Sequence, residues 1–295
     1  PDERDHARHV ANISGANFHS VEFGENDFWQ LLPEVTACLD DPTTDYAILP
    51  TFKLGAVARQ NGLKVVLCGE GGDELFAGYG RYRRLLKPWW LGGRPMRGKR
   101  LFDGTGILRE SQVEQNAEGT TTVNTNWSKL QEAQARDCSD WLPNDLLLKL
   151  DRCLMVHGVE GRTPFLDPEV SKIAMCLPDK LKIRNGQGKY LLRRWLERRL
   201  PDAKPFSRKR GFTVPVAEWI AEKATSTGEL VASRACIEEI AEPNQVRSLY
   251  SSLGQRPSRR MGQMAWTLLF YALWHRCHIE GKPLYQDVFE SLAAD

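Results

Sequence analysis

The stretch that most constrains the fold runs from Leu63 to Tyr79, where an apolar run leads through a glycine-rich turn into a helical pattern. The apolar run is short and rich in β-branched residues, which predicts a strand buried on both faces of a sheet. Gly69, Gly71 and Gly72 permit backbone conformations that other residues resist, and they let a ligand approach the main chain. A strand–turn–helix corner of this kind is a frequent ligand site in α/β proteins.

Three carboxylates lie in this turn, those of Glu70, Asp73 and Glu74. Carboxylates do not hold phosphate directly, but they bind Mg²⁺, which in turn binds phosphate. Alternatively, Asp73 and Glu74 only cap the helix that follows, because acids are favourable in a first helical turn. Three acids within five residues, beside glycines that leave them unshielded, favour the cation site.

Composition is that of an ordinary globular protein, with 41% hydrophobic and 26% charged residues in 295. The net charge of +2 gives no general reason to expect a nucleic-acid or membrane partner. No apolar run is long enough for a membrane span, and the opening residues do not resemble a signal peptide. Seven widely spaced cysteines indicate reduced thiols, so we expect a cytoplasmic protein. Because the first residue is Pro1, we expect the sequence to be a fragment.

Hydrophobic periodicity predicts a series of helices around this corner. An alternating pattern over residues 17–23 predicts a further strand, and residues 40–45 form an acidic loop. Helix, short turn, buried strand, glycine turn and helix in succession favour a doubly wound parallel sheet. The expected helices cover residues 6–15, 28–39, 49–60, 145–157, 189–196 and 261–274.

Two groups of residues invite a binding interpretation that the sequence does not favour. Residues 87–100 are basic and contain Trp89 and Trp90, as a nucleic-acid patch does, but a surface loop with an aromatic anchor is the preferred interpretation. His6 and His9 on one helix lack a third metal ligand, and two of the three residues His275, Cys277 and His278 point to different faces of a helix. Residues 114–126 are polar and are expected to form an exposed connector.

Lys189 is a candidate for binding an anion. It follows the polar turn at residues 185–188 and lies in the first turn of a predicted helix, where a cation is unfavourable unless an anion binds. An ordinary surface lysine is the alternative. Arg162 lies in a mostly apolar stretch and would need an acidic partner if buried, with Glu160, Asp167 and Asp151 nearby in sequence.

Residues 65–79 closely resemble the second ATP-site motif in the synthetase domain of glutamine-dependent asparagine synthetases. The segment around Arg162, Lys189 with the Leu-Arg that follows, and the Lys209–Pro215 region resemble further motifs of that family. Together these motifs cover most of residues 2–219 and the helix ending at Trp274. Cys68 departs from the pattern, because the family usually has serine there, and a thiol is a weaker hydrogen-bonding partner.

The resemblance implies a PP-loop ATP-pyrophosphatase fold, an α/β doubly wound parallel sheet with a mostly helical carboxy-terminal part. It implies a synthetase domain over residues 1–224 and a helical extension over 225–295. In the family reaction, ATP activates the side-chain carboxylate of aspartate as an acyl-adenylate, and ammonia derived from glutamine attacks it. Carried over by position, the resemblance implies that Glu70 and Lys189 are catalytic and that Asp73 binds Mg²⁺. It implies that Lys209 and Arg210 line the phosphate entrance or are solvated. The implied nucleotide-binding residues are Leu67, Cys68, Gly69, Gly71, Gly72, Asp73 and Glu74.

Two parts of the family pattern are absent from this sequence, the glutaminase domain and the Ser-Gly-Gly-x-Asp-Ser loop that grips pyrophosphate. We therefore expect the isolated piece to be inactive and to need either its own upstream sequence or a partner that supplies the loop, in a possible homodimer. Two other functions stay open. One is amidation of a different carboxylate, as in β-lactam synthetase-like enzymes or polysaccharide and peptide amidotransferases. The other is an ATP-binding scaffold that does not catalyse.

Overall fold

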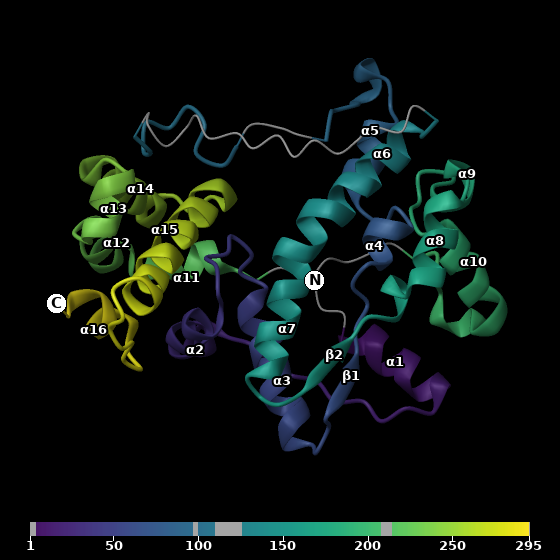
Figure 1. The fold of residues 1–295 in the computed structure, drawn as a ribbon, viewed down its shortest axis with the longest axis horizontal. Helices are drawn as coiled ribbons and strands as arrows, with labels where there is room; N and C mark the ends of the chain where they lie inside the picture. Colours follow the sequence, from purple (N-terminus) through teal and green to yellow (C-terminus); the bar gives the residue numbers. More distant parts are fainter. Residues whose placement is uncertain (1–3, 97–99, 110–125, 208–213, 295) are drawn as a thin grey trace.

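The computed structural model describes residues 4–96, 100–109, 126–207 and 214–294. The connector predicted at residues 114–126 therefore lies almost wholly outside the described residues, as do Lys209 and Arg210. Helices dominate the described chain, and its strands form one small parallel sheet (Figure 1). None of the described helices combines the length and the apolar character needed to cross a bilayer.

The sheet has two strands, β1 (Val65–Leu67) and β2 (Glu160–Arg162), which pair in parallel with Val66 opposite Gly161. Helices α3 (Ile48–Gln60) and α7 (Leu148–Met155) pack against each other beside it. Val66 contacts a small apolar cluster that contains Leu150 and Leu154 of α7. One face of the sheet is therefore covered by α7, and this sets the position of the glycine turn after β1.

The prediction that β1 is buried on both faces is wrong for this chain. Val65 is 41% exposed and Leu67 76% exposed, while Val66 between them is partly buried. Side chains alternate along a strand, so Val66 faces α7 and its two neighbours face away from it. The structure confirms an α/β chain with a parallel strand pair, and the doubly wound sheet stays a prediction.

The glycine turn joins β1 to a group of mostly short helices on one side of the molecule (Figure 1). A π-helical segment, η3 (Asp137–Leu147), continues directly into α7. In order along the chain, the other helices of this part are α1 (Arg4–Ser14), α4 (Gly72–Leu75), α5 (Gly80–Leu85), α6 (Lys129–Arg136), α8 (Pro168–Cys176), α9 (Asp179–Lys182) and α10 (Tyr190–Arg199).

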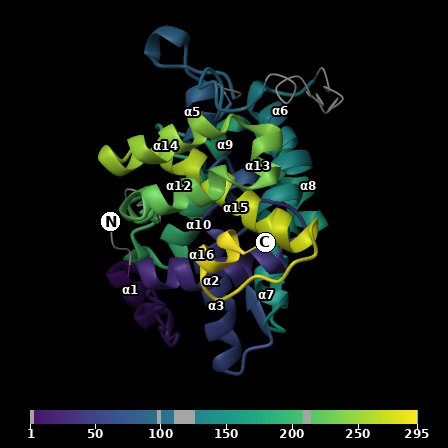
Figure 2. The same ribbon diagram turned by 90° about the vertical axis from the view of Figure 1, so that its left-hand side faces the viewer.

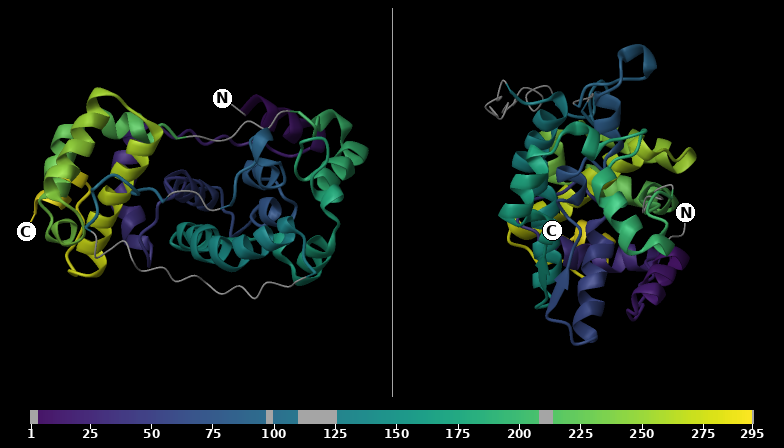
Figure 3. Two further views of the ribbon diagram at one scale, coloured as in Figure 1. Left: turned by 90° about the horizontal axis from the view of Figure 1, so that it is seen from above. Right: turned by 90° about the vertical axis from the view of Figure 1, so that its right-hand side faces the viewer.

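The segment that follows α5 stands out from the end of the molecule (Figure 2; Figure 3, right). It contains a short 3₁₀ turn, η1 (Trp89–Leu91). Two further 3₁₀ turns in the described chain, η4 (Pro164–Leu166) and η5 (Pro201–Ala203), connect elements of the body.

The largest apolar core lies in the carboxy-terminal helices and also includes α2 (Glu25–Cys38) from near the start of the chain. Its centre is α15 (Arg259–His278), where Trp266 is fully buried against Phe28 of α2 with ring centroids 5.9 Å apart. Because α2 belongs to this core, the division at residue 224 stays a prediction. The other helices of the group are α11 (Val216–Glu222), α12 (Ala224–Ala232), α13 (Ala235–Ile240), α14 (Pro243–Gln255) and α16 (Val288–Ala293).

The sequence-based helices are confirmed, with ends shifted by a few residues. Gly62, at the predicted stop of α3, has a φ of +76°, which favours glycine. The strand predicted over residues 17–23 is wrong, because residues 16–24 have no regular secondary structure and no neighbouring strand pairs with them. A strand needs a neighbouring strand to pair with its backbone N–H and C=O groups, and an alternating pattern of polar and apolar residues does not show whether one is present.

Candidate functional site

The glycine turn is shaped by close packing rather than by loose loop geometry. The backbone N–H of Cys68 donates to the carbonyl of Arg162 at 2.7 Å, so the pairing with β2 extends to the start of the turn. Gly71 has a φ of +84°, and a Cβ added there would lie 2.2 Å from Cδ2 of Leu166. Only glycine satisfies both conditions, and the chain therefore turns sharply from β1 into α4.

Asp73 and Lys189 meet at this corner. Their side chains form an ion pair, with 3.1 Å between Nζ of Lys189 and Oδ2 of Asp73. The Asp73 side chain is 22% exposed and the Lys189 side chain is 29% exposed. Gly78 lies directly against both: a Cβ added there would be 1.8 Å from Oδ1 of Asp73 and 2.5 Å from Cε of Lys189. The pair is thus held in a confined position that still opens to solvent.

The backbone around Lys189 explains how this lysine reaches the corner. Its φ of +54° is uncommon for a residue with a side chain. Its N–H donates to the carbonyl of Phe76 at 2.9 Å, and a Cβ on Gly188 would lie 2.1 Å from the carbonyl oxygen of Ala77. Lys189 is the residue that immediately precedes α10, not a member of its first turn as predicted.

Glu74 is placed differently from Asp73 although it is the next residue. Its side chain is only 1% exposed, and it accepts a hydrogen bond from the hydroxyl of Tyr79 at 2.6 Å. Burial and the hydrogen bond to Glu74 raise the pKa of Tyr79 far above its ordinary value, so the phenol stays protonated and continues to donate. Glu74 therefore faces the interior beneath the turn.

Glu70 and Cys68 flank the turn on the side of β1, and both are partly buried. Within the described part of the chain, the Glu70 side chain forms no hydrogen bond or ion pair, which leaves its carboxylate available. Burial, reinforced by the charge of Glu70, raises the pKa of the Cys68 thiol. Of the predicted residues, Asp73 and Lys189 are in direct contact, and Gly72 lies beside Lys189. The carboxylate of Glu74 is separated from this pair, because it is buried and hydrogen-bonded to Tyr79.

Two buried polar residues behind α4, Gln134 and Lys182, were not predicted from the sequence, and we call them the Gln134–Lys182 relay. Gln134 is fully buried, and its Nε2 donates to the carbonyls of Glu74 and Leu75 at 2.5 and 2.8 Å. Its Oε1 accepts from Nζ of Lys182 at 2.8 Å, and burial lowers the pKa of Lys182 to about 8. These contacts fix the carboxyl end of the helix that carries Asp73. Neither residue belongs to a motif, so only the three-dimensional structure identifies them.

Ion pairs tie the acidic loop at residues 40–45 to the helix that follows η3. Lys149 contacts Asp45 at 2.6 Å, and Arg152 contacts Asp40. Arg162 pairs with Glu160 at 3.0 Å, which is one of the three predicted partners, but its side chain is 61% exposed, so the suggested burial does not occur. Asp167 instead caps α8 by accepting from the N–H of Glu169.

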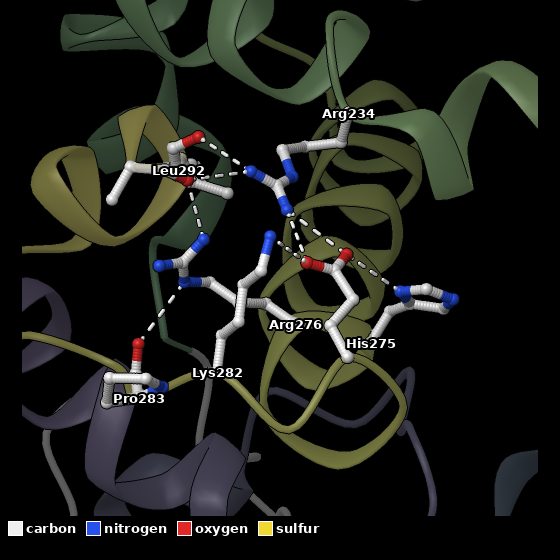
Figure 4. Close-up of polar contacts among 8 residues, drawn as sticks. Arg234, His275, Arg276, Lys282, Pro283 and Leu292 are labelled. Atoms are coloured by element: carbon white, nitrogen blue, oxygen red, sulfur yellow. Dashed lines mark hydrogen bonds and ion pairs between the residues drawn. The ribbon is translucent and has the colours of Figure 1, made fainter.

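A second cluster of charges lies among the carboxy-terminal helices (Figure 4). The carboxylate of Glu280 accepts two hydrogen bonds from Arg234, at 2.8 and 3.1 Å, and contacts Nδ1 of His275 at 3.1 Å. Arg234 and the buried Arg276 also donate to the carbonyl of Ala294, at 3.1 and 2.6 Å. The cluster joins α13, the end of α15 and the last residues after α16.

This second cluster does not offer a good metal site. In the part of the chain that the structure describes, one group of three potential ligands lies within 4.8 Å, namely Cys236, His275 and Glu280. Arg234 already occupies the Glu280 carboxylate, and burial raises the pKa of Cys236 to about 11, whereas metal binding needs a thiolate. His278 lies outside this group, and its Nε2 contacts the carbonyl oxygen of Thr36 at 3.1 Å.

Comparison with known proteins gives a consistent result. The asparagine synthase family model matches residues 1–276. A putative asparagine synthetase [glutamine-hydrolyzing] of Mycobacterium bovis is 30% identical over 95% of this chain and 48% of its own length. Asparagine synthetase [glutamine-hydrolyzing] 1 of Bacillus subtilis is 26% identical over 97% of this chain and 52% of its own length. The chain thus spans about half the length of these curated relatives, and it belongs to the asparagine synthase family.

Proposed function

We propose that the full-length protein is an ATP-dependent ligase that makes asparagine from aspartate and glutamine-derived ammonia. The observation that carries this proposal is the Asp73–Lys189 pair, held against Gly78 at the carboxyl end of a parallel strand. The names of the relatives, which include glutamine hydrolysis, support the source of ammonia. The rest of the full-length protein would supply the glutaminase and the loop that grips pyrophosphate.

The corner fits Mg²⁺ bound together with a nucleotide. Mg²⁺ is usually held by one or two carboxylates plus phosphate oxygens, and Asp73 presents one partly exposed carboxylate next to a cation. An added Cβ on Gly69 would meet no atom within 4 Å, so a ligand can approach the backbone there, and Leu67 and Cys68 precede it at the end of β1. When bound, Mg²⁺ would neutralise charge on the phosphates. Glu74, buried beneath the turn, would support the loop from below.

Lys189 and Glu70 are assigned separate tasks. The Lys189 ammonium would bind the phosphates and stabilise the negative charge that builds up when pyrophosphate leaves and when ammonia attacks. The Glu70 carboxylate, available in the same turn, would position the activated aspartate or accept a proton from the attacking ammonia. Both tasks require charges held in place before the reaction, which the packing around Gly78 and Gly188 provides for the lysine.

The proposal is tested by aspartate-dependent exchange of pyrophosphate into ATP, measured on the full-length protein. This exchange reports formation of the acyl-adenylate without requiring ammonia. We expect exchange with aspartate and Mg²⁺ and none when either is omitted. Exchange supported by a different carboxylate acceptor would identify a related amidotransferase, and no exchange with any acceptor, despite ATP binding, would identify a scaffold.

A further inference from the structure

The projection after α5 ends in exposed apolar side chains. Trp89, Trp90 and Leu91, which form η1, are 80%, 67% and 62% exposed. The two indole rings meet edge to face, with centroids 5.9 Å apart and an interplanar angle of 87°. We call residues 84–96 the tryptophan tip. Contiguous apolar surface of this kind on a projecting segment marks an interaction site.

Positive charge surrounds these apolar side chains. The sequence from Arg81 to Arg100 contains eight lysines and arginines and no aspartate or glutamate, although the whole chain carries a net charge of only +2. Arg84, Lys87 and Arg94 are exposed, and no described carboxylate lies within 4.0 Å of their charged groups. This segment is therefore strongly basic, although the net charge of the whole chain is close to zero.

Three arginines share one hollow at the base of the tryptophan tip. Arg81, Arg84 and Arg94 line an open cavity of about 620 Å³, together with backbone and side chains of residues 92, 95 and 96. Arg81 is paired with Asp137 at 2.9 Å, but the charges of Arg84 and Arg94 lack such a partner among the described residues. A phosphate group in this hollow would balance them, because guanidinium groups match phosphate in charge and geometry.

We propose that the tryptophan tip binds the surface of an anionic lipid bilayer, a property beyond the proposed ligase activity. Trp89, Trp90 and Leu91 enter the boundary between headgroups and acyl chains, while Arg84 and Arg94 bind headgroup phosphates. Tryptophan beside lysine and arginine is the combination that anchors proteins at a membrane interface. The tip stands clear of the body, so it can reach a flat surface (Figure 2; Figure 3, right).

Single-stranded nucleic acid fits the tip less well. Successive bases stack on aromatic rings along a basic groove, whereas these two rings are almost perpendicular and lie on a convex end with Leu91 beside them. A lipid interface accepts all three apolar side chains in any relative orientation. The observations therefore favour lipid, and nucleic acid becomes an outcome of the test.

The test uses the full-length protein and sedimentation with vesicles of phosphatidylcholine alone or mixed with phosphatidylglycerol. We expect binding to the mixed vesicles only, and weaker binding as salt is added. Arg84→Gln combined with Arg94→Gln should weaken it about twenty-fivefold, from roughly fivefold for each cation near an anionic surface. Trp89→Ser combined with Trp90→Ser should abolish it, and quenching of tryptophan fluorescence by brominated lipid should fall with it.

The matched control combines Trp195→Ser with Arg198→Gln on α10, where Trp195 is also 60% exposed. This variant should bind vesicles like the unmodified chain, and thermal melting followed by circular dichroism should show all variants folded. Failure of the unmodified chain to bind anionic vesicles would overturn the proposal. So would equal losses in the control, or binding of a single-stranded oligonucleotide through the tip without binding of vesicles.

Discussion

Two regions of the molecule place charged side chains close together. One is the glycine corner, the turn after β1 with Asp73 and Lys189, and the other is the charge cluster around Glu280 in the carboxy-terminal helices. The two regions satisfy these charges in different ways. At the corner, Asp73 and Lys189 pair with each other and stay 22% and 29% exposed. In the cluster, Glu280 is surrounded by Arg234, His275 and Lys282, and two arginines bind the carbonyl of Ala294.

The difference indicates which cluster is built for a ligand. Charges whose partners are all supplied by the protein, including backbone carbonyls, hold elements together. The corner instead lies at the carboxyl end of a parallel strand, a frequent ligand position, and an added Cβ on Gly69 would meet no atom within 4 Å, so an incoming group can approach the backbone there. We therefore propose the corner as the binding site, whereas the cluster fastens the end of the chain to α13 and α15.

The largest effect expected is on catalysis. Lys189→Ala in the full-length protein should lower aspartate-dependent exchange about a thousandfold, because the charge on the departing phosphates loses its stabilising cation. Its unfolding midpoint should hardly change, since a partly exposed ion pair contributes about 1 kcal/mol or less. Arg198→Ala on α10, the helix that Lys189 precedes, is the matched control and should retain exchange. Retained exchange in Lys189→Ala would remove this lysine from the mechanism.

A change in the second cluster should affect stability. Glu280→Gln leaves Arg234 without a compensating charge and should lower the free energy of unfolding by about 2–3 kcal/mol. Burial raises the pKa of Glu280, but the hydrogen bonds from Arg234 and His275 outweigh it, so the pKa is lowered in the folded protein. The stability that Glu280 contributes is therefore fully present above its unfolded pKa and is lost as the pH falls through its folded pKa. Urea unfolding measures the change, and the exposed Glu290→Gln should show none. A Glu280→Gln variant as stable as its parent would show that the cluster does not fasten the chain end.

Gly78→Ala sharpens the claim that packing sets the Asp73–Lys189 geometry. The added methyl group would overlap Oδ1 of Asp73, so the pair must move, and exchange should fall by at least about tenfold. Gly80→Ala is the control, because its Cβ meets only the ends of arginine side chains at 3.5 Å. Kinetics at several Mg²⁺ concentrations would check the result. Equal activity of both variants would show that Gly78 does not position the pair.

The Gln134–Lys182 relay behind the corner should make the stability of the protein depend on pH. Burial lowers the pKa of Lys182 to about 8, so between pH 8 and its ordinary value of 10.5 the unfolded chain binds a proton that the folded chain does not. The penalty for burying the charged lysine therefore disappears as the pH rises, and the free energy of unfolding should increase by up to about 1.4 kcal/mol per pH unit. Urea midpoints at successive pH values, compared with those of Lys182→Met, isolate this lysine. Parallel pH profiles would contradict the expectation.

Much of this could be predicted from sequence because the corner is local. Strand, glycine turn and short helix follow one another between Val65 and Leu75, and each is specified by its own residues. The opposite directions of Asp73 and Glu74 were not predictable, because they depend on Tyr79 and on the packing above α4. Likewise, the exposure of Leu67 depends on which elements cover β1, and the Gln134–Lys182 relay depends on contacts between distant helices.

The most direct test of the central claim is binding of Mn²⁺–ATP to the full-length protein, followed by electron paramagnetic resonance of the bound ion. Asp73→Asn should weaken binding of the metal by at least about tenfold, because the carboxylate is proposed as a ligand. Asp151→Asn, at an exposed acid elsewhere, should leave it unchanged. If Asp73→Asn binds Mn²⁺–ATP as tightly as the unmodified protein, the glycine corner does not hold the cation.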